Sequence, residues 1–106
     1  AMAMEVLASF PPRRILVTPG LVSLGPLEEA ANRQAGMQAA KAADLVVLVG
    51  ARHTQPLRDG LTAAGFPVEA IVSVRSLDEV THLIGTIVRP GDTVLFENDL
   101  PDTYDE

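Results

Sequence analysis

The sequence predicts a Rossmann-like α/β domain: a three-layer αβα sandwich around a mostly parallel sheet of at least four strands. Short apolar runs alternate along the chain with segments of helical period, and one run, residues 45–49, is apolar at every position. A strand without alternation is covered on both faces, which is typical of parallel sheets. Strands that are joined by helical crossovers run parallel, with right-handed connections and helices on both faces.

Residues 1–9 are rich in strong helix formers, and two consecutive prolines end that segment. We therefore expect residues 1–12 to be the end of a preceding helix or a leader, and residues 13–106 to form the domain. Residues 14–18, Arg-Ile-Leu-Val-Thr, are followed by a Pro-Gly pair and predict the first strand.

Gly25-Pro26 predicts the start of the next helix, because proline fits the first helical turn and two glutamates that follow suit the positive end of the helix dipole. We expect this helix to end near Ala43. Its inner face is predicted to consist of residues four apart with mostly small side chains, which suits a close approach to the sheet: Leu27, Ala31, Ala35 and Ala39.

The second strand is predicted over residues 45–49. Thr54 is expected to cap the third helix, which Gly65 ends. Residues 68–74 then predict the third strand. Two further elements complete the order, a helix and a short strand.

Ser76 with Glu79 has the spacing of a capping box. The helix that follows carries an apolar face at helical spacing, made of Leu77, Val80, Leu83, Ile84, Ile87 and Val88. A Pro-Gly-Asp turn precedes the fourth strand, residues 93–96. Residues 97–106 are acidic and are expected to be irregular.

Composition narrows the function. The chain of 106 residues fits one domain, has no cysteine, and carries 8 basic against 14 acidic residues, a net charge of −6. The absence of cysteine excludes disulfides and thiolate chemistry, and scattered basic residues argue against nucleic-acid binding. Since no apolar run approaches the roughly 20 residues of a membrane span, and the first residues lack a signal-peptide pattern, we expect a cytoplasmic protein without membrane contact.

Ligands of open α/β sheets bind at the carboxyl ends of the strands, so the segments that follow the four strands are the candidate site. None of them carries a Gly-x-Gly-x-x-Gly fingerprint, a phosphate-binding loop ending in Gly-Lys-Ser/Thr, or a Gly-x-Ser-x-Gly elbow. The sequence thus predicts the fold of many enzymes without the motifs that bind ATP or hydrolyse esters.

Two groups of polar residues lie in these segments. Arg52 and His53 follow the second strand, where cations can meet an anionic substrate or simply be solvated. The acidic group Glu97, Asn98, Asp99 and Asp102 follows the fourth strand; it can hold Mg²⁺, receive an ammonium group, or form a solvated tail. Gly20 most simply serves a turn.

Two segments resemble the Mur ligase family. Residues 17–25, Val-Thr-Pro-Gly-Leu-Val-Ser-Leu-Gly, followed by Asn32 and Gly36, are similar to the start of the C-terminal domain of these ligases. Residues 95–104, Leu-Phe-Glu-Asn-Asp-Leu-Pro-Asp-Thr-Tyr, are similar to the last strand and following loop in one branch of the family. The likeness covers about residues 13–104 and is nearest to the members that add D-alanyl-D-alanine to a UDP-muramoyl tripeptide.

The resemblance implies that the chain is the closing, amine-substrate-binding domain of an ATP-dependent, amide-bond-forming ligase of peptidoglycan precursor synthesis. Its partners would be the N-terminal and central ligase domains, and its substrates a UDP-linked muramoyl peptide and an amino acid or dipeptide. ATP and Mg²⁺ would bind mainly outside this chain, and the chain alone would be inactive. The implied substrate-binding residues, with no catalytic residue or metal ligand among them, are Thr18, Gly20, Asn32, Arg52, His53, Glu97, Asn98, Asp99 and Asp102.

Two departures bear on the substrate. Asn32 stands where the D-alanyl-D-alanine-adding members tend to have histidine, and Glu97-Asn98-Asp99 stands near a Lys-Gly-Ser of those members. Acidic groups in place of a basic one change what this edge can bind. Two other functions fit the residues alone: a free-standing, non-catalytic Rossmann-type module for ligand binding or regulation, and a small metal-dependent enzyme using the carboxylates.

Overall fold

A computed structural model describes the chain except for residues 1–6, 12, 22–24 and 98–106, and except for the side chains of residues 51–53. The strands are β1 (Arg14–Thr18), β2 (Leu45–Val49), β3 (Ile71–Val74) and β4 (Thr93–Phe96). The helices are α2 (Glu28–Ala42), α3 (Ala51–Ala63) and α4 (Leu77–Ile87), with single 3₁₀ turns η1 (Gly25–Leu27) and η2 (Val68–Ala70).

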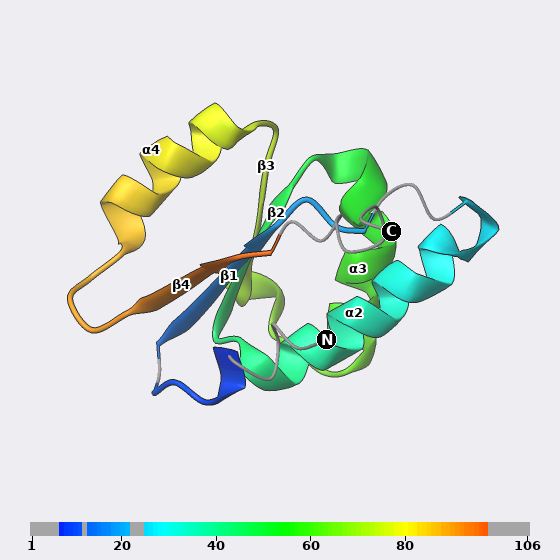
Figure 1. The fold of residues 1–106 in the computed structure, drawn as a ribbon, viewed down its shortest axis with the longest axis horizontal. Helices are drawn as coiled ribbons and strands as arrows, with labels where there is room; N and C mark the ends of the chain where they lie inside the picture. The colour runs from blue at the N-terminus through cyan, green and yellow to red at the C-terminus, as the bar shows by residue number, and fades with distance from the viewer. Residues whose placement is uncertain (1–6, 12, 22–24, 98–106) are drawn as a thin grey trace, which may run out of the picture.

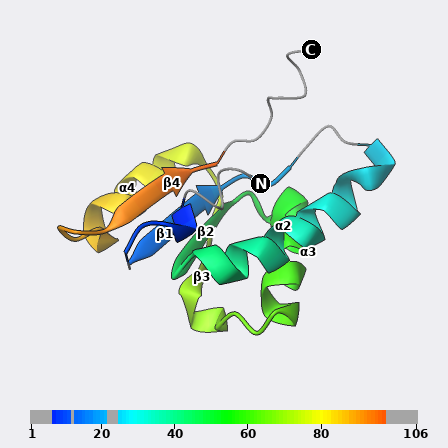
Figure 2. The ribbon, with the colours of Figure 1, turned by 60° about the horizontal axis from the view of Figure 1, so that its bottom comes forward.

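The four strands form one parallel sheet in the order β3-β2-β1-β4. Helices α2 and α3 cover one face and α4 covers the other (Figures 1 and 2), which confirms the predicted Rossmann-like sandwich. The chain runs outward from β1 to β3 and then returns through α4 to place β4 on the other side of β1. The strand order therefore reverses between β1 and β4, and this reversal is where open α/β sheets bind ligands.

The central strands are buried on both faces, as the uninterrupted apolar runs predict. Leu16, Val46 and Leu48 pack into one cluster with residues of α2 and α3, and Leu7 also lies buried in that cluster. The neighbouring positions Ile15, Val17 and Val47 pack with Val80 of α4 in a second cluster, so side chains alternate between the two faces.

Helices α2 and α3 touch through their backbones. A β-carbon added to Gly36 would lie 2.1 Å from the carbonyl oxygen of Leu57, and one added to Gly60 would lie 2.0 Å from that of Arg33. The predicted inner face of α2 is confirmed at Ala39, which is buried, and at Ala35, which packs against the core, but it is wrong at Leu27, which is 68% exposed. The other buried positions of the helix are Asn32, Gly36 and Ala42, and Gly36 lies at the contact with α3.

Two predicted boundaries are also wrong. Helix α3 begins at Ala51, not after Thr54, because Gly50 at φ 90° lets the chain enter the helix at once. Thr54 is not a cap; its hydroxyl donates back to the carbonyl oxygen of Gly50. The third strand begins at Ile71, since the residues before it form η2, in which the amide of Ala70 donates to the carbonyl oxygen of Pro67 at 3.0 Å.

Helix α4 begins as predicted, with Ser76 as its cap. The Ser76 hydroxyl accepts from the amide of Glu79 at 3.4 Å, but the Glu79 carboxylate accepts from the amide of Arg75 at 2.7 Å, one residue before the expected partner. This bond lowers the pKa of Glu79. The helix packs over β2 and β3. The same face is therefore less covered beside β4.

Ion pairs connect the amino-terminal ends of the strands, on the side of the sheet away from the carboxyl ends. Asp44 accepts from the amide of Arg14 at 2.7 Å and from its guanidinium at 3.1 Å, and Asp92 pairs with Arg13 at 2.7 Å. The hydrogen bonds from Arg14 and Arg13 hold the pKa values of Asp44 and Asp92 below their ordinary value. These four side chains therefore stabilise the contacts between the starts of β1, β2 and β4.

Candidate functional site

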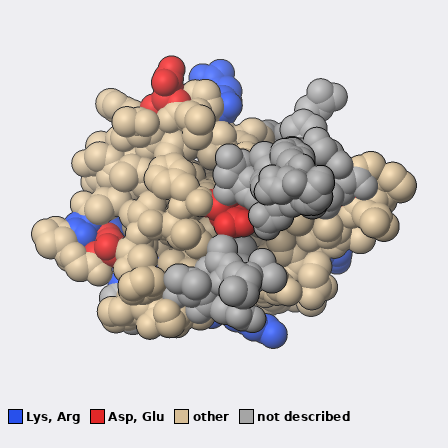
Figure 3. Space-filling model, viewed as in Figure 1, with Lys and Arg blue, Asp and Glu red and all other residues tan. Residues whose placement is uncertain are grey.

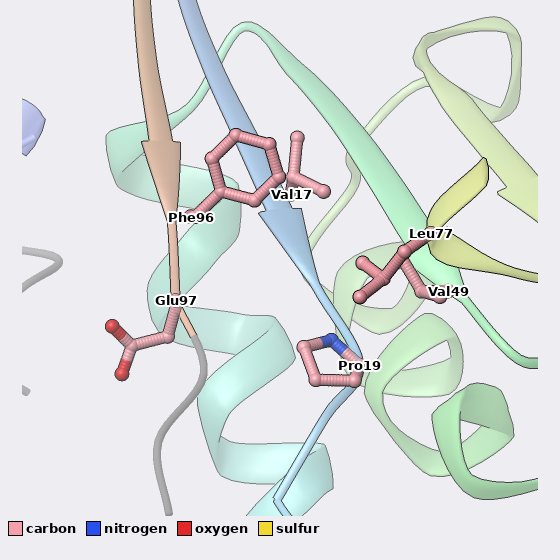
Figure 4. A pocket seen from close by; sticks show the side chains of 6 residues that line it. All are labelled: Val17, Pro19, Val49, Leu77, Phe96 and Glu97. Carbon is pink, nitrogen blue, oxygen red and sulfur yellow. The ribbon is translucent and has the colours of Figure 1, made fainter. Parts of the chain in front are cut away.

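A pocket of about 260 Å³ lies at the carboxyl ends of β1, β2 and β4, beside the reversal of strand order. It opens on the face of the sheet that α4 only partly covers. Figure 4 shows its lining, in which β1 and β4 supply one side and β2 and the start of α4 the other. The lining residues are Val17, Pro19, Val49, Leu77, Phe96 and Glu97.

The pocket is apolar inside. Five of its six lining residues are hydrocarbon or aromatic, and the carboxylate of Glu97 points away from the other five side chains (Figure 4). Phe96 and Leu77 are 57% and 65% exposed, so they form the mouth of the pocket, whereas Val17 is buried at its base. No basic side chain lines the pocket among the described residues, and an anion placed in it would lose its hydration without gaining a partner.

The loop after β1 is held by two buried side chains. Thr18 accepts from the amide of Gly20 at 3.0 Å. Asn32, fully buried on α2, accepts from the amide of Leu21 at 2.8 Å and donates to its carbonyl oxygen at 2.8 Å. The Asn32 amide also donates to the carbonyl oxygen of Glu28 at 2.9 Å, which ties the loop to the first turn of α2.

These bonds decide what the loop can bind. In dinucleotide-binding folds, free backbone N–H groups after the first strand and the adjoining helix N-terminus bind phosphate. Here the N–H groups of Gly20 and Leu21 already donate to Thr18 and Asn32. The first turn of α2 also lies away from the strand ends (Figure 1). The described residues of the loop, 19–21, therefore form a wall of the pocket, with Pro19 in its lining, and their two N–H groups are not free to bind phosphate.

The predicted site residues that the structure describes lie in different environments. Thr18 and Asn32 are buried and shape the loop, and Gly20 gives it a turn at φ 83°. Glu97 lies at the rim, where its amide continues the sheet by donating to the carbonyl oxygen of Val17 at 2.9 Å. Positions 52 and 53 lie in the first turn of α3, but the side chains of Arg52 and His53, and all of Asn98, Asp99 and Asp102, lie outside the described residues.

Sequence reasoning missed the apolar lining of the pocket. Phe96 and Val49 were interpreted only as strand residues, and Leu77 only as part of an apolar helix face. One signal was available: Leu77 is apolar and follows the cap Ser76 directly, at the point where α4 begins just beyond the carboxyl end of β3.

A second hollow, of about 380 Å³, lies between α4 and the β3 edge, where Val74 and Leu83 form its floor. Its rim carries Asp78, Glu79 and His82, and Glu79 is paired with Arg75 at 3.3 Å. No group of three or more histidine or acidic residues in the described part of the chain is placed to hold a metal ion. The hollow thus offers no defined ligand chemistry.

Comparisons with protein-family profiles, with characterised proteins and with solved structures give no match. Within the described ranges, none of the helices combines the length and the apolar character that crossing a bilayer requires.

Proposed function

We propose that the chain is the closing, amine-substrate-binding domain of an ATP-dependent, amide-bond-forming ligase of the Mur type, acting in peptidoglycan precursor synthesis. The observation that carries the proposal is the occupied loop after β1, in which Thr18 and Asn32 take up the backbone N–H groups of Gly20 and Leu21. A domain with this fold, in which the described N–H groups after β1 are occupied, fits a role in which the nucleotide is bound elsewhere.

The chemistry of amide-bond formation divides naturally between domains. ATP and Mg²⁺ activate the acceptor carboxylate, and the amine then attacks the acyl phosphate. A closing domain contributes by orienting the amine and excluding water, so it needs no nucleophile or general base of its own. ATP, Mg²⁺ and the UDP-linked muramoyl peptide would bind mainly to the partner domains, and the chain alone would be inactive.

Glu97 is the described residue that we assign to the amine. It follows β4 directly, and its backbone is fixed to β1, so its carboxylate lies at the rim beside the pocket mouth. A carboxylate stabilises an ammonium group through a charge-assisted hydrogen bond. Asp99, which the sequence also places at this edge, lies outside the described residues and is assigned from the sequence alone.

The test is steady-state kinetics of the ligase encoded by the complete reading frame, assayed with a UDP-linked muramoyl peptide, ATP and the amine. Glu97→Ala and Asp99→Ala should each raise the apparent KM for the amine by about 10- to 150-fold and leave the KM for ATP unchanged, because a lost charged hydrogen bond costs about 1.5–3 kcal/mol. Glu69→Ala, an exposed glutamate on η2, is the matched control. Unchanged amine kinetics in both variants, or a reading frame without ATP-dependent ligation, would rule out the assignment.

A further inference from the structure

We infer that the pocket at the end of β1, β2 and β4 holds an uncharged, apolar side chain, so that the amine partner is one with an aliphatic or aromatic substituent. This inference rests on the proposed function for the amine itself. The kind of substituent is inferred from the pocket alone, namely from its volume, its lining residues and their charge.

Volume sets the size of the group. A closed apolar cavity of about 150 Å³ holds a benzene ring, whereas pockets for drug-sized ligands begin near 300 Å³. The pocket of about 260 Å³ lies between these values. It suits one medium-sized side chain and is too small for a nucleotide or a whole muramoyl peptide.

The lining sets the polarity of the group. Val17 and Val49 come from the sheet, Pro19 from the loop that Asn32 fixes, and Phe96 and Leu77 from the mouth. In Figure 3 the surface over α4 and β4 is largely uncharged, with one acidic group near the centre of the view and other charged groups near its margins. A carboxylate or ammonium among the five apolar side chains would be desolvated without a partner in the described lining, so acidic and basic substituents are disfavoured there.

Such a ligand needs a carboxylate for its ammonium group and apolar walls for its substituent, and the structure offers these at separate places. The carboxylate of Glu97 points away from the pocket interior, at the rim, while the apolar walls lie inside (Figure 4). An amine with its ammonium at the rim and its substituent inside satisfies both. Discrimination between substituents then comes from the pocket, and Glu97 acts on every amine alike.

The experiment is an amide proton–nitrogen NMR titration of the chain with three probes at millimolar concentration. Leucinamide carries an ammonium and an aliphatic side chain, isocaproamide lacks only the ammonium, and isoglutamine carries an acidic side chain. Leucinamide and isocaproamide should shift the signals of Phe96, Leu77 and Val49, and isoglutamine should bind at least about tenfold more weakly because its carboxylate has no partner inside. Equal binding of isoglutamine, or shifts confined to other residues, would overturn the inference, as would the absence of shifts with both apolar probes.

A pair of variants separates pocket binding from weak surface association. Leu77→Asp puts a charge at the mouth and should weaken binding of both apolar probes about tenfold, while an acidic residue in the first turn of α4 preserves the helix. Leu27→Asp is the matched control, since Leu27 lies directly before α2, much as Leu77 lies at the start of α4, and is similarly exposed; it should leave binding unchanged. Equal effects of the two variants would contradict the inference. If leucinamide and isocaproamide bind equally well, the pocket stands and the role of Glu97 in amine binding fails.

Discussion

Replacing Gly60 by alanine introduces a methyl group at the contact between α3 and α2. The added carbon would lie 2.0 Å from the carbonyl oxygen and 2.9 Å from the carbonyl carbon of Arg33, and real contacts are essentially never under 3.0 Å. The obstacle is backbone, so no side chain can rotate away, and the helices must separate by about 1 Å. Separation of this kind disturbs a packed core along the length of the contact.

The magnitude follows from two opposing effects. Overpacking a core costs about 1–3 kcal/mol, and a backbone obstacle belongs at the upper end of that range. Alanine recovers about 1 kcal/mol of helix propensity relative to glycine. The expected net loss is about 2 kcal/mol, which lowers the melting temperature of a domain of this size by about 8–16 °C.

The assay is urea and thermal unfolding followed by circular dichroism, with Gly85→Ala as the matched control. Gly85 also lies within a helix, α4, but a β-carbon there meets nothing within 4 Å, so the same substitution should stabilise the domain by up to about 1 kcal/mol. If Gly60→Ala were as stable as the parent chain, the close approach of α2 and α3 would be wrong, and with it the placement of Asn32.

Two further predictions concern stability. Asn32→Leu should cost about 2–4 kcal/mol and speed amide exchange of Leu21, because three hydrogen bonds to partly buried backbone groups are lost; unchanged urea midpoints and exchange would contradict the loop assignment. The second concerns acid: folding lowers the pKa values of Asp44 and Asp92 below their ordinary 3.8, so their stabilisation is complete above about pH 4 and is lost as the pH falls through the folded values. The urea midpoint should be flat near neutrality and fall below about pH 4, and Asp44→Asn should reduce that fall; an equal fall with and without Asp44 would remove its ion pair from the account.

The sequence was sufficient for the strands because their signal is local. Residues 45–49 are apolar throughout, and burial on both faces is the direct physical consequence. The two boundaries that were predicted wrongly depend on backbone geometry. Gly50 allows α3 to begin three residues before Thr54. The carbonyl oxygen of Pro67 accepts from the amide of Ala70, a residue that was predicted to lie in the third strand.

The candidate site was only partly predictable, because its parts meet through tertiary structure. The resemblance placed Asn32 among ligand-binding residues, but its partner Leu21 lies 11 positions away and the bond forms only when α2 packs on the sheet. The pocket likewise joins Leu77 to Phe96, which are separated by the whole of α4 and a turn. The edge of the sheet that carries the site was predictable from the alternation of strands and helices along the chain, whereas the apolar character of its pocket required the three-dimensional structure.

The central claim is that the backbone N–H groups of Gly20 and Leu21, in the described part of the strand-end loop, do not bind phosphate because they are already bonded within the chain. Titrating the chain with inorganic pyrophosphate while following the amide signals of Gly20 and Leu21 tests it most directly. The account predicts no saturable change at these two signals at millimolar pyrophosphate. A saturable shift of both would contradict it and would identify the loop as a phosphate site.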